Sequence, residues 1–120
     1  MWRRTAWCVG LIFLIPFVLG IEITEVELNP AGSDGGAEWI ELFSDEEINL
    51  GNYKLKNNDG DEIILEGEVS GYYIYLLTSQ WLDNKDEKVF IYKGDEKIDE
   101  SDLLEDVEND DKTWQKCKDW

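Results

Sequence analysis

The sequence contains no histidine, only two cysteines and two prolines, and far fewer basic residues than acidic ones. Without an imidazole group, the chain cannot form a Ser-His-Asp triad, a Cys-His dyad or a zinc site with histidine ligands. Its 11 basic residues stand against 28 acidic ones, which gives a formal net charge of −17 at pH 7. A negative field of this size repels phosphate backbones, so we do not expect the protein to bind nucleic acid.

The N-terminal segment, residues 5–21, contains no charged residue and follows Arg3 and Arg4. A short basic region, an apolar core and a small residue before the cleavage point are typical of a secretory signal, here cleaved after Gly20. The alternative is an uncleaved anchor helix, although the run is short for a membrane span and Pro16 would disturb the helix. Both interpretations predict a secreted or extracytoplasmic protein, tethered to the membrane through residues 5–21 if the signal is retained.

Residues 1–20 therefore form the predicted signal or anchor, and residues 21–120 form one predicted domain. The first segment has two arginines and no acid, so the domain keeps nine basic and 28 acidic side chains and a formal charge of −19. Its single cysteine is Cys117. After cleavage no internal disulfide can form, so we expect a free or partly buried thiol and a domain that packing alone stabilises.

The domain sequence shows short apolar and alternating segments separated by turn signals, which predicts an all-β sandwich or barrel. Asn-Asp-Gly at 58–60 and Gly-Asp at 94–95 mark two hairpin turns. Residues 71–79 are apolar on both faces, as expected of a strand inside a two-layer structure. No segment after residue 20 keeps a helical stripe, and only residues 79–84 suggest a single helical turn. The predicted strands span residues 21–29, 38–44, 50–57, 61–67, 71–79, 112–118 and the two arms of the 88–101 hairpin.

Four pieces of the domain resemble the lamin tail domain family in the right order. "IEITEVELNP" followed by "EWIEL" is similar to the opening signature, "INLGNYKLKN" to the next motif and "DDKTWQK" to the closing motif. The resemblance covers nearly all of residues 21–120 and implies an immunoglobulin-like β-sandwich, preceded by the signal or anchor helix. The motif residues that it assigns to structural roles are Glu25, Glu38, Trp39, Glu41 and Trp114.

The resemblance also implies a class of function. In bacteria and archaea, similar domains occur on exported proteins, often beside hydrolases, and are regarded as attachment or interaction modules. The chain resembles this exported version standing alone, so we expect a non-catalytic module that binds a protein or cell-surface partner. Two alternatives are a calcium-stabilised structural module of the cell envelope and a small carboxylate-dependent hydrolase or nuclease accessory.

Two acidic turns and the C-terminal segment supply the candidate binding residues. Calcium takes several oxygen ligands, which Asp59 and Asp61 in one turn, or Asp106 and Asp110 in another, would provide. Neither segment matches an EF-hand, and Asp also suits turns for conformational reasons, so we expect no cofactor other than weakly bound Ca²⁺. The C-terminal segment, residues 112–120, gathers basic and aromatic residues, with Trp114 expected in the core. The candidate partner-binding residues are Lys116, Lys118 and Trp120.

The stretch "EWIELF" at 38–43 contains two glutamates among large apolar residues. Side chains alternate along a strand, so Glu38 and Glu41 should point to opposite faces and cannot act as a close pair. A carboxylate among apolar neighbours needs hydrogen-bond donors. We therefore expect a donor to fix Glu41 between Trp39 and Phe43 and to lock the strand register.

Overall fold

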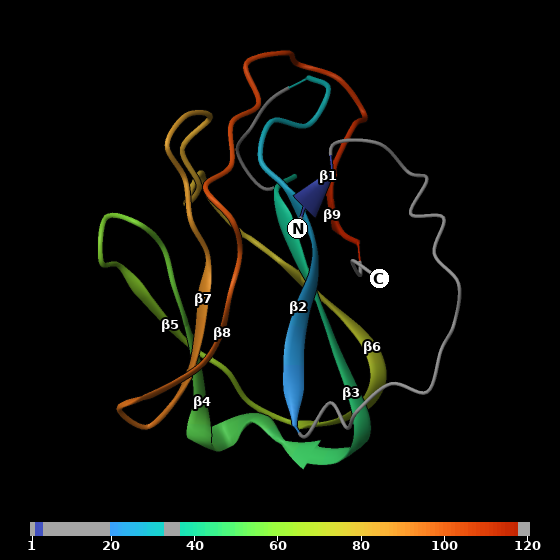
Figure 1. The fold of residues 1–120 in the computed structure, drawn as a ribbon, viewed down its shortest axis with the longest axis vertical. Helices are drawn as coiled ribbons and strands as arrows, with labels where there is room; N and C mark the ends of the chain where they lie inside the picture. The colour runs from blue at the N-terminus through green and yellow to red at the C-terminus, as the bar shows by residue number, and fades with distance from the viewer. Residues whose placement is uncertain (1, 4–19, 33–36, 118–120) are drawn as a thin grey trace.

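The computed structural model describes residues 2–3, 20–32 and 37–117, which form an all-β structure of two antiparallel sheets (Figure 1). We call the five-stranded sheet A and the four-stranded one sheet B. Sheet A contains, in spatial order, β1 (Trp2–Arg3), β9 (Trp114–Lys116), β2 (Ile21–Glu27), β3 (Trp39–Asn49) and β6 (Glu68–Leu76). Sheet B contains β5 (Glu62–Ile64), β4 (Tyr53–Lys56), β7 (Phe90–Lys93) and β8 (Glu96–Glu100). The all-β prediction is confirmed, and the two-sheet arrangement is compatible with a β-sandwich.

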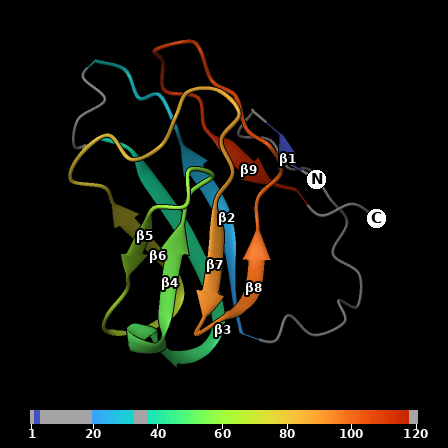
Figure 2. The ribbon, with the colours of Figure 1, turned by 90° about the vertical axis from the view of Figure 1, so that its left-hand side faces the viewer.

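The core lies between the two sheets, and in Figure 2 β4, β7 and β8 of sheet B lie in front of β2 and β3 of sheet A. Period-two alternation directs one side of each strand inward, and these inward side chains are mostly aliphatic. Each fully buried side chain of this kind contributes roughly 1.5–3 kcal/mol relative to exposure. The fully buried residues include Ile23 and Val26 of β2, Ile40 and Leu42 of β3, Leu55 of β4 and Ile91 of β7.

Both predicted hairpin turns are present in sheet B. The β4–β5 turn closes with hydrogen bonds between Asn57 and Asp61, and Gly60 adopts a φ of 90°. The β7–β8 turn contains Gly94 at a φ of 60°. Only glycine adopts such conformations without steric cost, so these two glycines mark the turns between strands in the sequence.

Strand β3 and the segment that follows it differ from the prediction. β3 continues to Asn49, because after a register shift between Ser44 and Ile48 it pairs again with β6. The next residues form the short 3₁₀ helix η1 (Leu50–Asn52), which delays β4 until Tyr53. The side chain of Asn49 caps η1 by accepting the backbone N–H of Gly51 at 2.9 Å. The single helical turn suggested for 79–84 is absent, and bends occupy this segment.

Strand β6 was expected to be covered on both faces, and this expectation is wrong for one of them. β6 lies at the end of sheet A, and its residues alternate between exposed and half-buried. Tyr73 and Tyr75 pack against the core. The side chains of Tyr72, Ile74 and Leu76 point the other way and are 70%, 54% and 58% exposed.

The predicted signal or anchor falls largely outside the described residues. Of the segment 1–20, residues 2–3 form β1, which pairs Trp2 with Lys116 and Arg3 with Gln115, and residues 4–19 are not described. Within the described part of the chain, no helix has the length and apolarity that a membrane crossing requires.

Cys117, next to the end of β9, is disulfide-bonded in the full chain. The free or partly buried thiol was predicted for the domain after signal cleavage, and it stays a prediction for that form. Two candidate partner-binding residues, Lys118 and Trp120, lie outside the described residues.

Candidate functional site

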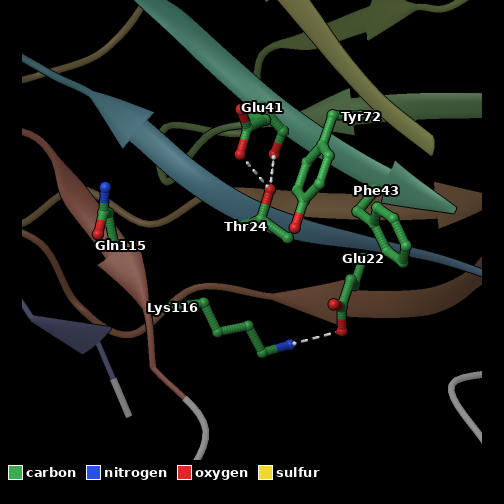
Figure 3. A pocket seen from close by; sticks show the side chains of 7 residues that line it. All are labelled: Glu22, Thr24, Glu41, Phe43, Tyr72, Gln115 and Lys116. Carbon is green, nitrogen blue, oxygen red and sulfur yellow. Dashed lines mark hydrogen bonds and ion pairs between the residues drawn. The ribbon is translucent and has the colours of Figure 1, made fainter. Parts of the chain in front are cut away.

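The side of sheet A that faces away from the core, here called the outer face, contains an open groove of about 460 Å³. Strands β2, β3, β6 and β9 all contribute side chains to it (Figure 3). The lining residues are Glu22, Thr24, Glu41, Phe43, Tyr72, Gln115 and Lys116.

A local irregularity in β2 shapes the groove. The β2–β3 register shifts between Ile23 and Glu25, so Thr24 and Glu25 are both half-buried and break the strict alternation of the strand. Bulges of this kind re-aim side chains and increase local twist. In this structure the bulge brings the hydroxyl of Thr24 to the carboxylate of Glu41.

Glu41 lies half-buried in the groove, on the same side of β3 as Phe43. The Thr24 hydroxyl donates a hydrogen bond to its Oε1 at 2.9 Å (Figure 3). Burial raises the pKa of the Glu41 carboxyl, the Thr24 hydrogen bond lowers it, and the neighbouring charge of Glu25 raises it further. The expectation that a donor fixes Glu41 is confirmed, and the donor comes from the adjacent strand β2.

Lys116 lies at the β9 side of the groove and is engaged by two carboxylates. Its Nζ is 3.5 Å from Oε2 of Glu22 and 3.3 Å from Oδ2 of Asp99. The same Asp99 oxygen accepts the backbone N–H of Ile23 at 2.9 Å, and thereby connects β8 of sheet B to β2 of sheet A. This candidate partner-binding lysine is therefore already ion-paired within the chain.

Two further motif residues fasten β9 to its surroundings. Oε1 of Glu25 accepts hydrogen bonds from the hydroxyl of Thr113 and, at 2.9 Å, from the side-chain amide of Gln115. The indole N–H of Trp114 donates to the backbone carbonyl of Glu105 at 3.1 Å, and its ring packs against the core. These contacts are structural, and Trp114, expected in the core, is half-buried and packs against it.

Glu38 lies on the opposite side of the chain from Glu41, as the alternation predicts. Its side chain is completely buried, and its Oε1 accepts the backbone N–H groups of Trp81 at 2.8 Å and Leu82 at 3.2 Å. It connects the start of β3 to the segment between β6 and β7. The two glutamates of "EWIELF" therefore belong to separate environments.

Another buried carboxylate, Glu87, was missed from the sequence. Its Oε1 accepts the backbone N–H of Asn58 at 2.9 Å, and its Oε2 accepts that of Asp83 at 2.6 Å. Burial raises its pKa, and the backbone hydrogen bonds oppose the shift. Glu87 shares the inward side with Val89 and Ile91. This alternation could have indicated from the sequence that Glu87 is buried, but the surrounding polar residues concealed it.

The first pair of calcium candidates, Asp59 and Asp61, lies in the β4–β5 turn. The backbone N–H groups of both residues donate to Oδ1 of Asn57, at 3.1 and 2.9 Å. The pKa of nearby Asp83 is raised by desolvation and by the carboxylates of Asp59 and Asp61. This turn therefore accumulates negative charge around an asparagine-capped bend.

The second pair, Asp106 and Asp110, lies in the loop before β9. Oδ1 of Asp106 accepts the backbone N–H of Glu108 at 3.1 Å, and Oδ1 of Asp110 accepts that of Lys112 at 2.9 Å. Both aspartates therefore cap local turns. Across residues 2–3, 20–32 and 37–117, no three or more acidic or cysteine side chains are grouped in a way that could bind a metal ion.

The chain matches no family model, no curated protein and no solved structure. Evidence about its function therefore comes from the outer face of sheet A. There, a groove rich in carboxylates adjoins the exposed apolar side chains of an edge strand.

Proposed function

We propose that this protein is a non-catalytic, extracytoplasmic attachment module that binds a protein or cell-surface partner. The main observation in support is the outer face of β6, where Tyr72, Ile74 and Leu76 are more than half exposed. Contiguous exposed apolar side chains, rimmed by polar ones, are typical of interaction sites. In this proposal the fold is an immunoglobulin-like sandwich similar to the lamin tail domain.

The groove beside β6 supports binding more than chemistry. Thr24 engages Glu41, and Glu22 engages Lys116, so these polar side chains mainly position one another. Phe43 and Tyr72 add an aromatic pair with ring centroids 4.7 Å apart. Aromatic residues next to polar groups that are already oriented suit the recognition of a partner surface.

The sequence supports an extracytoplasmic location. Arg3 and Arg4 precede the uncharged segment 5–21, which is the pattern of a signal or anchor. A partner outside the cytoplasm would meet a domain with a formal charge of −19, and this charge disfavours association with other acidic surfaces.

A sedimentation assay with cell envelopes of the source organism tests the proposal. The labelled full-length chain should co-sediment saturably, and an excess of unlabelled chain should displace it. Leu76→Lys should reduce the retained fraction at least fivefold, whereas Leu103→Lys, at a similarly exposed leucine in the loop after β8, should leave it unchanged.

Two outcomes of this assay would contradict the proposal. Equal retention of Leu76→Lys and the unchanged chain would exclude the outer face, and no saturable retention would exclude attachment altogether. Parallel measurements with Ca²⁺ and with a chelator separate the calcium-stabilised alternative, because that alternative requires retention to disappear with the chelator.

A further inference from the structure

The edge of β6 that faces away from β3 presents backbone groups to solvent. The backbone N–H of Leu77 donates to the carbonyl of Glu38 at 2.9 Å, and the β3–β6 ladder continues in register from there. Hydrogen-bonded and non-hydrogen-bonded pairs alternate in an antiparallel ladder. The N–H and C=O groups of Tyr72, Ile74 and Leu76 therefore point to the outer edge, where sheet A adds no further strand among the described residues.

This edge lacks the features that normally protect edge strands. Charged side chains, especially lysine, and prolines usually prevent unwanted strand pairing. Residues 69–79, "VSGYYIYLLTS", contain neither a charge nor a proline, in a chain that is 32% charged. An open edge of this kind is the feature that domains use to bind an extended peptide as an added strand.

A strand added at this edge would place its side chains in two different environments. Side chains directed inward would continue the row of Tyr73 and Tyr75, which pack against the core. Side chains directed outward would cross Tyr72 and Ile74 toward the groove, in which Glu41 lies two strand spacings away, roughly 10 Å. The stem of a lysine or arginine suits this path because it is apolar along its length and charged at its end.

Charge complementarity favours a basic occupant. The groove contains two carboxylates, Glu22 and Glu41, and a third, Glu25, lies directly across the β2–β3 ladder from Glu41. The lysine that lines the groove, Lys116, already contacts Glu22 and Asp99. The raised pKa of the Glu41 carboxyl shows that its surroundings disfavour the negative charge. A cationic group of the partner would compensate that charge, with added attraction from the aromatic faces.

We infer that β6 binds an extended polypeptide segment of a partner protein as an additional strand, with alternating apolar and basic side chains. The apolar side chains lie beside Tyr73 and Tyr75, and a lysine or arginine crosses Tyr72 to reach Glu41. This inference rests on the proposed function, because it names the chemistry of the partner that the outer face would bind.

Peptide binding to the full-length chain tests the inference by fluorescence anisotropy. The probe is an eight-residue peptide of alternating valine and lysine, labelled at one end. Two control peptides are the same sequence with glutamate in place of lysine, and the original sequence N-methylated at alternate backbone nitrogens. The first removes the positive charge, and the second removes the hydrogen bonds to the strand edge. Both controls should bind at least tenfold more weakly.

Matched substitutions at Ile74 isolate the backbone contribution. Ile74→Pro removes an N–H that points to the open edge and leaves the ladder to β3 intact, since proline is tolerated at such positions. Ile74→Ala removes the side chain and keeps this N–H, so the proline variant should bind the valine-lysine peptide at least fivefold more weakly than the alanine variant. Glu41→Gln should weaken binding about threefold or more, and Ile64→Lys, on strand β5 of sheet B, should not.

Several results would overturn the inference. One is equal binding of the N-methylated and unmodified peptides, a result that is decisive even if the proline variant does not fold. The others are equal binding by the proline and alanine variants, and no peptide binding at all. Self-association that Ile74→Pro abolishes would identify a second copy of the chain as the occupant. If Leu76→Lys loses envelope attachment while Ile74→Pro retains it, the proposed function stands and the added strand is excluded.

Discussion

The buried carboxylate of Glu38 accepts the backbone N–H of Trp81 at 2.8 Å, across 43 residues of sequence. It also accepts the N–H of Leu82, in the connection that leads from β6 in sheet A to β7 in sheet B. Buried backbone N–H groups need an acceptor, and this side chain supplies one for both of them. Glu38 therefore fixes the crossover between the sheets, and its role is structural.

Replacement of Glu38 should destabilise the fold strongly. Glu38→Ala removes two buried hydrogen bonds and leaves two N–H groups without their acceptor, so the free energy of unfolding should fall by about 3 kcal/mol. Urea denaturation monitored by tryptophan fluorescence measures the change. Glu47→Ala, at an exposed position of β3, is the control and should change stability by less than about 0.5 kcal/mol. A loss below about 1 kcal/mol for Glu38→Ala would contradict the assigned role.

Glu87 should behave in the same way at the opposite end of that connection. It accepts N–H groups from the β4–β5 turn at Asn58 and from Asp83, so Glu87→Ala should cost about 3 kcal/mol. Glu87→Gln keeps an acceptor oxygen and should cost about half as much. Hydrogen exchange provides a local measurement, because the Asn58 and Asp83 amides should lose protection. Unchanged exchange at both amides would refute the assignment.

The sequence predicts most of the sheet structure because alternation and turn chemistry are local properties. Gly60 and Gly94 mark turns that require positive φ, and both occur as expected. The course of β3 beyond Ser44 could not be predicted, since the charged residues 45–47 conceal a strand that shifts register and pairs again. Periodicity also reports which residues are apolar, but not which face another layer covers. This is why the exposed face of β6 was missed.

The candidate site, too, was predictable only where its features follow from local geometry. The opposed directions of Glu38 and Glu41 follow from the backbone geometry of a strand, and the structure confirms them. The donors Thr24 and Trp81 lie on other segments, and their proximity depends on strand order and on the bulge in β2. No local pattern contains that information, so the need for donors was predictable but their identity was not.

Asp99 supplies another contact between the sheets. Its Oδ2 accepts the N–H of Ile23 at 2.9 Å and lies 3.3 Å from Nζ of Lys116. Asp99→Ala should lower stability by about 2 kcal/mol, because a backbone N–H in β2 loses a charged acceptor. Lys116→Ala removes only the partly exposed ion pairs and should cost less than about 1 kcal/mol. Exchange of the Ile23 amide should accelerate in the first variant and not in the second, and the reverse order would disprove this account.

Glu27, at the end of β2, should make stability depend on pH near neutrality. Its side chain is buried, and its pKa is raised from the ordinary 4.5 to about 7, mainly by burial. The carboxylates of Asp106, Asp110 and Asp111 raise the pKa further, and a hydrogen bond from the backbone of Asn29 opposes the shift. Between pH 4.5 and 7 the folded chain therefore binds a proton that the unfolded chain has released. The contribution of this group to stability is present at low pH and is lost as the pH rises through about 7.

The Glu27→Gln variant should isolate this effect, because glutamine stays neutral and keeps an oxygen to accept the Asn29 N–H. At pH 8 the variant should be more stable than the unchanged chain, by up to about 3 kcal/mol for a shift of this size. The difference should shrink steadily as the pH is lowered to 5, where both chains carry a neutral group at this position. Urea titrations at several pH values measure it, and Glu66→Gln at an exposed position should show no such trend. A Glu27→Gln variant whose stability difference is the same at pH 5 and pH 8 would show that Glu27 keeps an ordinary pKa in the folded chain.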